Sequence, residues 1–377
     1  MKIAIFGGSF NPVHNEHIMM AKGIVKELCL DKLLIMPTCI APHKKDLTAV
    51  SGEHRLNMLR LAFENCENIE VSDYELKKGG ISYSYQTVEH IKSVYNPSKL
   101  YFLTGSDMLE NFPTWKFPER ILNSATLVLC ERKTGEFDSD VLIKTINEKF
   151  GAEVIKLKCY GENISSTKVR VYKMLGLSLD GLVPNSVENY IEKNNLYNSN
   201  EYYEYVKNAL PTKRKTHTAG VILTALKYAK KLGVDKGKAE LSALLHDVAK
   251  YEDPKNFPNL KEIENLPEDI IHQYLGYYIA KERLNVEDLD VLNAIKYHTT
   301  GRPSMSDLEI VLYLADLLEP SRKFLGVEEL RKAVDSDFKK GFVTCLEEIV
   351  EFLKLSGKEV YPLTSDALNF YKKGETL

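Results

Sequence analysis

The chain has 377 residues, enough for two domains of ordinary size, and 44% of them are hydrophobic, enough for a core in each domain. The net charge of −3 provides no overall basic field, which argues against DNA as a partner and favours small anions that bind locally. The sequence contains no apolar run of about 18 residues and no CxxC pair among its six cysteines, so we expect a cytoplasmic protein with reduced thiols and without a membrane span, a disulfide framework or a zinc knot.

The first half of the chain alternates short apolar runs with amphipathic helical patterns. The runs predict strands at residues 2–6, 32–37, 69–71, 100–103, 126–130 and 153–157. Several of them are continuously apolar, which is typical of strands covered on both faces. Helical patterns, such as those at residues 16–28 and 53–63, lie between the runs. This alternation predicts an α/β fold of the Rossmann type, with a parallel sheet and helices on both sides.

The pattern changes at residues 195–200, where asparagine and serine cluster and the hydrophobic periodicity lapses. Beyond this stretch apolar residues recur at helical spacing, and no convincing strand follows. The clearest series are Leu241, Leu244, Leu245 and Val248, and Leu308, Val311, Leu312 and Ala315. The sequence therefore predicts an α/β domain over residues 1–197 and an all-α domain over residues 203–377.

Features of a phosphate-binding site follow the first predicted strand, which runs into GGSF at residues 7–10 and then into His14 and His17. Two glycines after a strand let the backbone approach a phosphate closely, and the next helix offers its N-terminal N–H groups to an anion. The histidines are three residues apart, so both imidazoles lie on one side of the helix start and can stabilise charge on a phosphate. The alternative, a βα turn with two surface histidines, is disfavoured by the combination of strand, glycines and spaced histidines.

The segment GGSFNPVHNEHI resembles the HxGH signature of nucleotidyltransferases that adenylylate or cytidylylate a phosphate. Glu16 stands where the family has a glycine between the histidines, and a carboxylate there can crowd or repel the phosphates. Both histidines are intact, so we do not interpret the change as inactivating. NISSTKVR at residues 163–170 resembles the ISSTxIR motif at a second phosphate-binding helix, where hydroxyls cap the helix and Arg170 clamps a phosphate. A merely well-capped helix is the alternative, and an arginine one turn into the helix favours the phosphate site.

Further segments resemble bacterial nicotinate mononucleotide adenylyltransferases, and the resemblance covers essentially all of residues 1–197. TGSDMLENFPTW, residues 104–115, matches the stretch that in the family holds the ATP ribose and stacks a tryptophan on the acceptor's pyridine ring. APHK, SYSYQTV and LVPNSVENYIEKNNLY match the family's acceptor loop, acceptor segment and closing segment. A lone tryptophan more often belongs to a core, but the position of Trp115 in a proline-containing loop after a strand favours contact with a ligand.

The resemblance implies that the 5′-phosphate of nicotinate mononucleotide attacks the α-phosphorus of ATP and expels pyrophosphate, with Mg²⁺ bound to ATP. It assigns catalytic roles to His14, His17 and Arg170. It assigns ATP binding to Gly7, Gly8, Ser9, Phe10, Gly105, Asp107, Ser165, Ser166 and Thr167. It assigns acceptor binding to His43, Lys44, Arg55, Tyr83, Thr87 and Trp115. Phosphopantetheine adenylyltransferase is the alternative within the superfamily, and the Trp115 loop and residues 82–88 argue against it.

The second half of the chain contains four histidines in apolar helical contexts, and two aspartates accompany them. The six residues are His217, His246, Asp247, His272, His298 and Asp316, with the His-Asp pair on the predicted helix AELSALLHDVAK. An isolated histidine usually satisfies a local hydrogen bond. Burying so many titratable groups together is unfavourable unless a metal neutralises them, so the sequence predicts a metal site.

The order H…HD…H…H…D resembles the HD superfamily of metal-dependent phosphohydrolases. RKTHTAGV, LLHDVAKY, HQYLG, YHTTGR and LADLLEPSRK resemble bacterial symmetrical diadenosine tetraphosphate hydrolases, over about residues 203–370. The resemblance implies one metal held by His217, His246, Asp247 and Asp316, and a second held by His272 and His298, with Asp247 also catalytic. Iron is the expected metal, with zinc or manganese as alternatives. Lys250 and Arg302 are candidates for binding polyphosphate, and a solvated helix end is the alternative for Lys250.

These observations lead to the hypothesis of a bifunctional enzyme that makes a dinucleotide and hydrolyses dinucleotide polyphosphates such as diadenosine tetraphosphate. One alternative makes the second domain a nucleotide-sensing module that regulates the first. An intact set of six ligands argues for hydrolysis, because a sensor has no need to keep them all. A helical RNA-binding module is a further alternative, and the slightly acidic charge balance gives it little support.

Overall fold

Six parallel strands form one sheet in the order β3-β2-β1-β4-β5-β6, and helices make up the rest of the regular structure. The computed structural model describes residues 1–40, 50–131, 139–158, 164–264 and 266–373. The strands are β1 (Lys2–Gly8), β2 (Lys32–Pro37), β3 (Ile69–Val71), β4 (Lys99–Thr104), β5 (Thr126–Glu131) and β6 (Val154–Lys158). They lie where the apolar runs predicted them, which confirms a Rossmann-like α/β fold followed by a helical region.

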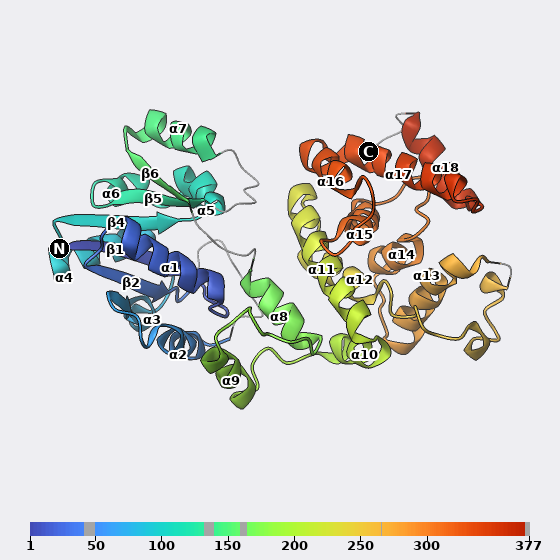
Figure 1. The fold of residues 1–377 in the computed structure, drawn as a ribbon, viewed down its shortest axis with the longest axis horizontal. Coiled ribbons are helices and arrows are strands. Elements are labelled where there is room, and N and C mark those ends of the chain that lie inside the picture. The colour runs from blue at the N-terminus through green and yellow to red at the C-terminus, as the bar shows by residue number, and fades with distance from the viewer. Residues whose placement is uncertain (41–49, 132–138, 159–163, 265, 374–377) are drawn as a thin grey trace. The chain divides into compact units, whose positions relative to one another are not determined.

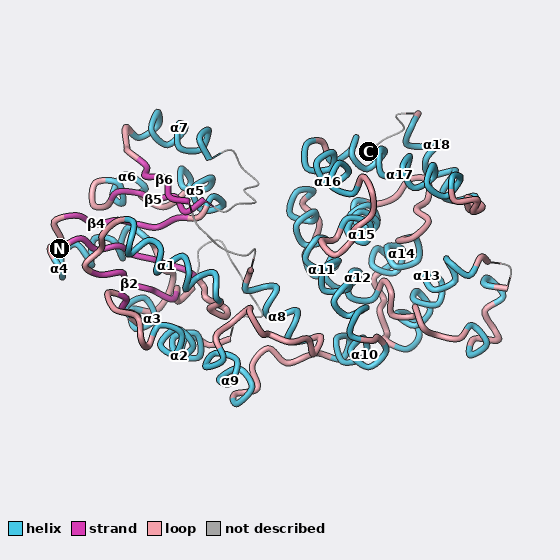
Figure 2. Tube along the Cα trace, viewed as in Figure 1, coloured by secondary structure: helices cyan, strands magenta, loops and turns pink. Residues whose placement is uncertain are grey.

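The chain divides into two compact units (Figure 1). The α/β unit contains residues 1–170 and 178–198, and the helical unit contains residues 171–177 and 199–377. The short stretch 171–177 lies within the first domain by sequence, yet it belongs to the helical unit because Val171, Leu175 and Leu177 are buried in that unit's core. Figure 2 shows that all strands of the described residues lie in the α/β unit.

Helices connect the strands of the α/β unit and cover the sheet. They are α1 (Asn15–Glu27), α2 (Gly52–Phe63), α3 (Tyr74–Lys78), α4 (Ser84–Tyr95), α5 (Ser106–Asn111), η1 (Phe112–Thr114), α6 (Pro118–Leu122), α7 (Ser139–Phe150) and α9 (Asn185–Lys193). Helix α8 (Ser166–Met174) contributes residues to both units. One face of the sheet packs on α4, where Ile3 and Ile5 of β1 share a cluster with Val88 and Ile91. Helices α1 and α2 contact β2.

The strand order brings two predicted ATP-binding segments to one edge of the sheet. β1 pairs with β2 on one side and with β4 on the other. Successive strands are therefore added to one side of β1 up to β3 and to its other side from β4 onward. In parallel sheets ligands bind at such a switch point, outside the carboxyl ends of the strands. The glycine segment that ends β1 and Gly105, which follows β4, both lie at this edge.

The helical unit consists of nine α-helices and three short helical turns among its described residues. They are α10 (Glu201–Ala209), α11 (Thr212–Leu232), α12 (Lys236–Leu245), α13 (Glu268–Tyr278), α14 (Leu289–Tyr297), α15 (Asp307–Leu318), α16 (Val327–Ser336), α17 (Phe338–Leu355), α18 (Pro362–Lys372), η2 (Pro254–Asn256), η3 (Lys261–Ile263) and η4 (Ile279–Arg283). Helix α15 packs on α11 and α14, and α12 packs on α11. The predicted helical series supply buried core residues, including Leu244 and Val311.

One helix ends earlier than its sequence predicts. Helix α12 stops at Leu245, so His246 and Asp247 lie in the following turn and not on the helix. The Nδ1 atom of His246 bonds the carbonyl of Ala243, which removes the acceptor that would continue the helix. Tighter i to i+3 bonds follow, such as that from Val248 N–H to the carbonyl of Leu245 at 3.1 Å.

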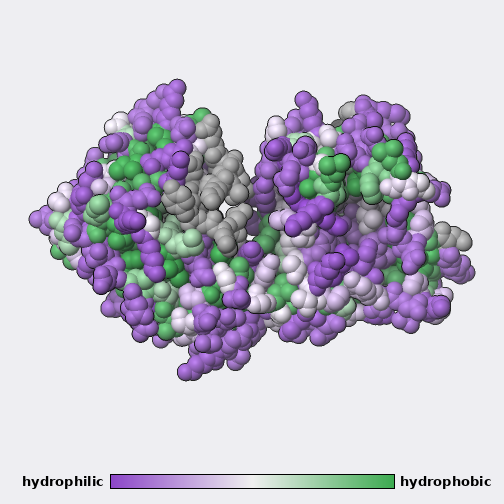
Figure 3. All heavy atoms as spheres, in the orientation of Figure 1, coloured by the Kyte–Doolittle hydropathy of each residue, from purple (hydrophilic) through white to green (hydrophobic). Residues whose placement is uncertain are grey.

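Hydrophilic side chains dominate the visible face of each unit, and hydrophobic ones show in smaller patches (Figure 3). None of the helices in the described part of the chain combines the length and the apolar composition that a bilayer crossing requires.

The close approach of α16 and α17 depends on Gly341, because a Cβ atom there would lie 2.5 Å from the backbone N and Cα of Val334. We expect Gly341→Ala to lower the melting temperature of the helical unit, since overpacking of this kind costs about 1–3 kcal/mol. Gly23→Ala in α1 is the matched control, because a Cβ there meets no atom within 4 Å and alanine favours a helix. Differential scanning calorimetry measures both changes, and equal effects would contradict the packing argument.

Candidate active sites

His14 and His17 lie together at the start of α1, beside the glycine segment. Their ring centroids are 3.6 Å apart and the rings are stacked. The backbone N–H of His14 donates to Nδ1 of His17 over 3.2 Å. Because Nδ1 of His17 accepts this bond, the neutral ring carries its proton on Nε2, which is then a hydrogen-bond donor. The structure thus pairs the two imidazoles and fixes the tautomer of one of them.

The second predicted phosphate segment is joined directly to the first. Ser166 Oγ donates to the carbonyl of Pro12 over 2.7 Å, and Arg170 Nη1 donates to the carbonyl of Asn11 over 2.7 Å. Ser165 Oγ accepts the backbone N–H of Lys168 over 3.1 Å, as expected of the residue that caps α8. Two motifs about 150 residues apart in the sequence therefore form one structure at the end of β1.

Thr167, Gly105 and Asp107 also belong to the predicted ATP-binding residues. The hydroxyl of Thr167 accepts a long hydrogen bond of 3.4 Å from Arg170 Nη2. Gly105 caps the N-terminus of α5. Asp107 lies within α5, and its side chain is outside the described part of the structure.

Two predicted acceptor residues are buried and bonded within the protein. The guanidinium of Arg55, a residue in the first turn of α2, donates to the carbonyl of Ser9 over 2.8 Å and so supports the glycine segment. The hydroxyl of Thr87 donates to Glu75 over 2.6 Å. Burial raises the pKa of Glu75, against the opposing effect of this hydrogen bond.

Tyr83 and Trp115 belong to two neighbouring loops. The Lys116 ammonium lies 4.5 Å from the ring centre of Tyr83, so the loop that carries Trp115 contacts the predicted acceptor segment. Trp115 is half-buried against Phe112, with ring centroids 5.4 Å apart. His43 and Lys44, also predicted to bind acceptor, lie outside the described residues.

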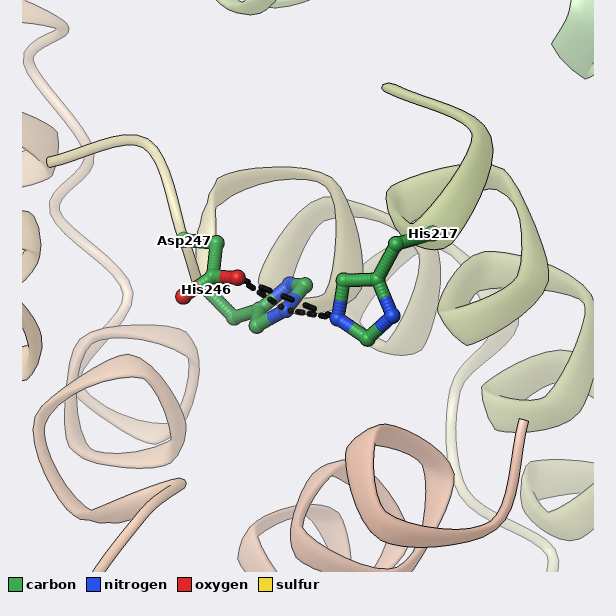
Figure 4. Close-up of side chains that lie close together, drawn as sticks. All are labelled: His217, His246 and Asp247. Carbon is green, nitrogen blue, oxygen red and sulfur yellow. Dashed lines mark hydrogen bonds and ion pairs between the residues drawn. The ribbon is translucent and has the colours of Figure 1, made fainter. Parts of the chain in front are cut away.

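The helical unit brings all six predicted metal ligands together. His217 comes from α11, His246 and Asp247 from the turn after α12, His272 from α13, His298 from the C-cap of α14, and Asp316 from α15. Figure 4 shows His217 pointing toward His246 and Asp247. The Nε2 atom of His217 lies 3.0 Å from Asp316 Oδ1 and 3.4 Å from His246 Nε2.

Asp247 stands between two groups of ligands. Its Oδ2 atom lies 3.5 Å from His246 Nε2 and 3.8 Å from His217 Nε2. Its Oδ1 atom lies 3.4 Å from His272 Nε2 and 3.9 Å from His298 Nε2. Each of these two triplets has the spacing needed to hold a metal ion, and they share the one carboxylate.

The histidine tautomers test whether these residues fit a metal. Nδ1 of His246 and of His298 lies 2.7 and 2.8 Å from a backbone carbonyl, and Nδ1 of His217 lies 3.0 Å from Glu319 Oε1. Carbonyl and carboxylate oxygens only accept hydrogen bonds, so Nδ1 carries the proton on each ring. The Nε2 atoms therefore converge with the carboxylates of Asp247 and Asp316, which is the donor arrangement of histidine–metal sites.

The pKa values of two histidines and two aspartates agree with such a donor set. For His217, burial lowers the pKa, but the hydrogen bonds with Asp316 and Glu319 outweigh this effect and raise it. Burial, together with the neighbouring charges, lowers the pKa of His272 to about 3 and that of His298 to about 4, so both rings are neutral at pH 7. Burial opposes ionisation of Asp247 and Asp316, but the surrounding imidazoles hold the pKa of both carboxyls below the usual range. Neutral imidazoles beside ionised carboxylates, without thiolates, suit iron, manganese or zinc.

Positive charges surround the cluster, and the sequence motifs did not single out two of them. Arg214 Nη1 donates to Asp247 Oδ2 over 2.7 Å, and Arg322 donates to the carboxylate of Asp316. Lys250 Nζ lies 3.3 Å from the ring nitrogens of His272, which places this predicted polyphosphate ligand beside the cluster. Arg302 instead forms a bidentate pair with the buried carboxylate of Glu309. Arg214 and Arg322 lie three and six residues from predicted ligands, a spacing that could have indicated them.

Glu319 is a further site residue that the sequence reasoning missed. It is buried, bonds Nδ1 of His217, and accepts the backbone N–H of Ser321 over 2.7 Å. Gly220 on α11 makes room for it, because a Cβ atom there would collide with the Glu319 carboxylate. Glu319 thereby fixes the orientation of His217. Its only sequence signal was the segment LADLLEPSRK, which also carries Asp316.

Comparison with known proteins matches the two halves of the chain to two different families. A cytidylyltransferase-like family model matches residues 5–171, and an HD domain model matches residues 214–321. The "Probable nicotinate-nucleotide adenylyltransferase/Ap4A hydrolase" of Mycoplasma genitalium is 33% identical over 366 residues, which is 94% of this chain and 99% of that protein.

Two shorter relatives match one half each. The "Probable nicotinate-nucleotide adenylyltransferase" of Clostridium tetani is 36% identical and aligns over 52% of this chain and 98% of its own length. The "Bis(5'-nucleosyl)-tetraphosphatase, symmetrical" of Bacillus subtilis is 35% identical and aligns over 47% of this chain and 99% of its own length.

We expect Glu319→Ala to weaken metal binding by roughly 10–100-fold while the protein stays folded, because His217 loses the group that orients it. Isothermal titration with Mn²⁺ measures the affinity, and circular dichroism reports folding. Glu328→Ala is the matched control, since this carboxylate on α16 is exposed and pairs with Arg331. Equal affinities for the two variants would contradict the role of Glu319.

Proposed function

Since this chain belongs to the family that includes the nicotinate-nucleotide adenylyltransferase/Ap4A hydrolase of Mycoplasma genitalium, and is therefore an enzyme of transferase and hydrolase type, we propose that it catalyses both reactions. The α/β unit transfers AMP from ATP to nicotinate mononucleotide and yields nicotinate adenine dinucleotide and pyrophosphate. The helical unit hydrolyses diadenosine tetraphosphate to two ADP at a dinuclear metal site. The observation that carries the proposal is the full-length similarity together with the convergence of both sets of site residues.

The transfer step needs positioning and charge stabilisation, and no covalent intermediate. The acceptor's 5′-phosphate attacks the α-phosphorus of ATP in line, and the bond to pyrophosphate breaks. The Nε2–H group of His17 would donate to a phosphate oxygen as charge develops there. Mg²⁺ bound with ATP would shield the triphosphate. Arg170 and the hydroxyls at the start of α8 would hold the remaining phosphate oxygens.

The hydrolysis step depends on the two triplets that share Asp247. His217, His246, Asp247 and Asp316 would hold one ion, and His272, His298 and Asp247 the other. Two such ions, when bound, would activate a water molecule and stabilise the leaving phosphate.

The protein's own cations complete this site. Arg214, Lys250 and Arg322 lie against its ligands and would neutralise the charge of a polyphosphate chain. Because every predicted ligand converges on Asp247 or His217, the arrangement supports a hydrolase over a nucleotide-sensing module.

Purified protein should convert ATP and nicotinate mononucleotide into nicotinate adenine dinucleotide, as measured by product chromatography with competing acceptors. His17→Ala should lower the turnover number roughly 100–1,000-fold with a smaller effect on ATP binding, because it removes a donor to the transition state. A preference for phosphopantetheine would refute the assignment. An unchanged turnover number for the variant would remove His17 from the mechanism.

Diadenosine tetraphosphate should yield two ADP, and the metal-loaded protein should contain two ions per chain by elemental analysis. Asp247→Ala should abolish hydrolysis and reduce the metal content, because it removes the carboxylate that both triplets share. Adenylyl transfer by the same preparation should stay nearly unchanged, since each unit has its own core. Products of AMP and ATP would contradict the symmetrical cut, and a parallel loss of transfer would contradict independent units.

A further inference from the structure

Glu16 occupies the position between His14 and His17 where the nucleotidyltransferase signature has glycine. The sequence alone predicts a carboxylate that can crowd or repel phosphates. The side chain is instead 4% exposed, and its Oε2 atom accepts the backbone N–H of Ile164 over 2.7 Å. The carboxylate also lies in the first turn of α1, where the helix dipole favours a negative charge.

Glu16 bonds a residue near the start of the second phosphate segment. Ile164 is itself buried and precedes Ser165, which caps α8. The bond from Ile164 to Glu16 therefore acts at the N-terminal end of α8, and its acceptor is a carboxylate, which makes it stronger than a bond between neutral groups.

Two further bonds, both to neutral carbonyl acceptors, continue the connection along α8. Ser166 reaches the carbonyl of Pro12, and Arg170 reaches the carbonyl of Asn11. Three hydrogen bonds thus join residues 11–16 to residues 164–170, and the one with a charged acceptor is made by the residue that departs from the signature.

We propose that Glu16 is a positioning residue that fixes the start of α8 relative to His14 and His17, so that both phosphate-binding segments are preformed for the triphosphate of ATP. This inference rests on the proposed adenylyl transfer. Without the carboxylate, ATP must order the start of α8 as it binds, which weakens binding and misplaces the reacting phosphates. A displacement of about 1 Å can reduce a rate by 100-fold.

Variants of Glu16 separate the effect of side-chain length from the effect of the negative charge. Glu16→Gln keeps an oxygen at the same distance from Ile164 without the charge, so it should retain kcat/KM for ATP within about fivefold, as expected when a charge-assisted bond becomes a neutral one. Glu16→Asp keeps the charge but is one methylene shorter, so it should lose about 10–100-fold. Glu16→Gly, which restores the signature, should lose at least as much. The KM for nicotinate mononucleotide should change less than about twofold, because its predicted contacts lie on other loops.

Steady-state kinetics of these variants, with ATP varied at saturating nicotinate mononucleotide, tests the proposal. Glu27→Ala is the control, because this exposed glutamate lies at the other end of the same helix. If Glu16→Gly matches or exceeds the wild type, or if Glu16→Asp is more active than Glu16→Gln, the positioning role is wrong and repulsion or charge decides instead.

Hydrogen–deuterium exchange gives a readout that does not require activity. The amide of Ile164 should exchange faster in Glu16→Asp and Glu16→Gly than in Glu16→Gln, at unchanged circular dichroism. Unchanged exchange in all variants would overturn the inference. Absence of transfer by the wild-type protein would refute the proposed function, while the exchange data would still decide whether Glu16 holds the start of α8.

Discussion

The buried carboxylate of Asp247 sets the requirements that the rest of the helical unit meets. Its side chain is 4% exposed and lies among apolar helices, where an uncompensated charge would be strongly destabilising. Each of its oxygens faces two imidazoles, and Arg214 donates a hydrogen bond to the Oδ2 atom. The compensation is therefore built from three helices and one turn, which explains why the predicted ligands come from such distant parts of the chain.

Three imidazoles around Asp247 are oriented by hydrogen bonds at Nδ1, the ring nitrogen that faces away from Asp247. At the ends of α12 and α14, a backbone carbonyl accepts a hydrogen bond from Nδ1–H of His246 and of His298, respectively. For His217, which lies within α11, the carboxylate of Glu319 is the acceptor. Gly220 then becomes necessary, because only a residue without Cβ leaves space for the Glu319 carboxylate. One requirement, a fixed Nε2 lone pair, thus accounts for two helix ends, a buried glutamate and a glycine.

The α/β unit solves a different problem, which is to hold loops of the chain at the edge of a sheet. The strand order brings the ends of β1 and β4 together, but the loops that follow are not rigid by themselves. Hydrogen bonds from residues 164–170 to residues 11–16, and from Arg55 to Ser9, supply that rigidity. Side chains that the signature assigns to ligands, such as Arg55 and Arg170, therefore also support the backbone.

The sequence by itself determined the strands, the Rossmann-like and helical classes, and the six residues that converge in the helical unit, because period, glycine positions and histidine motifs are local signals. It misplaced residues 171–177 and the end of α12, since tertiary burial of Val171 and Leu175 and the bond from His246 to Ala243 override local pattern. It did not identify Arg214, Glu319 or the role of Glu16. Each of these acts through a partner 33 to 148 residues away, and only the folded chain decides which distant groups meet.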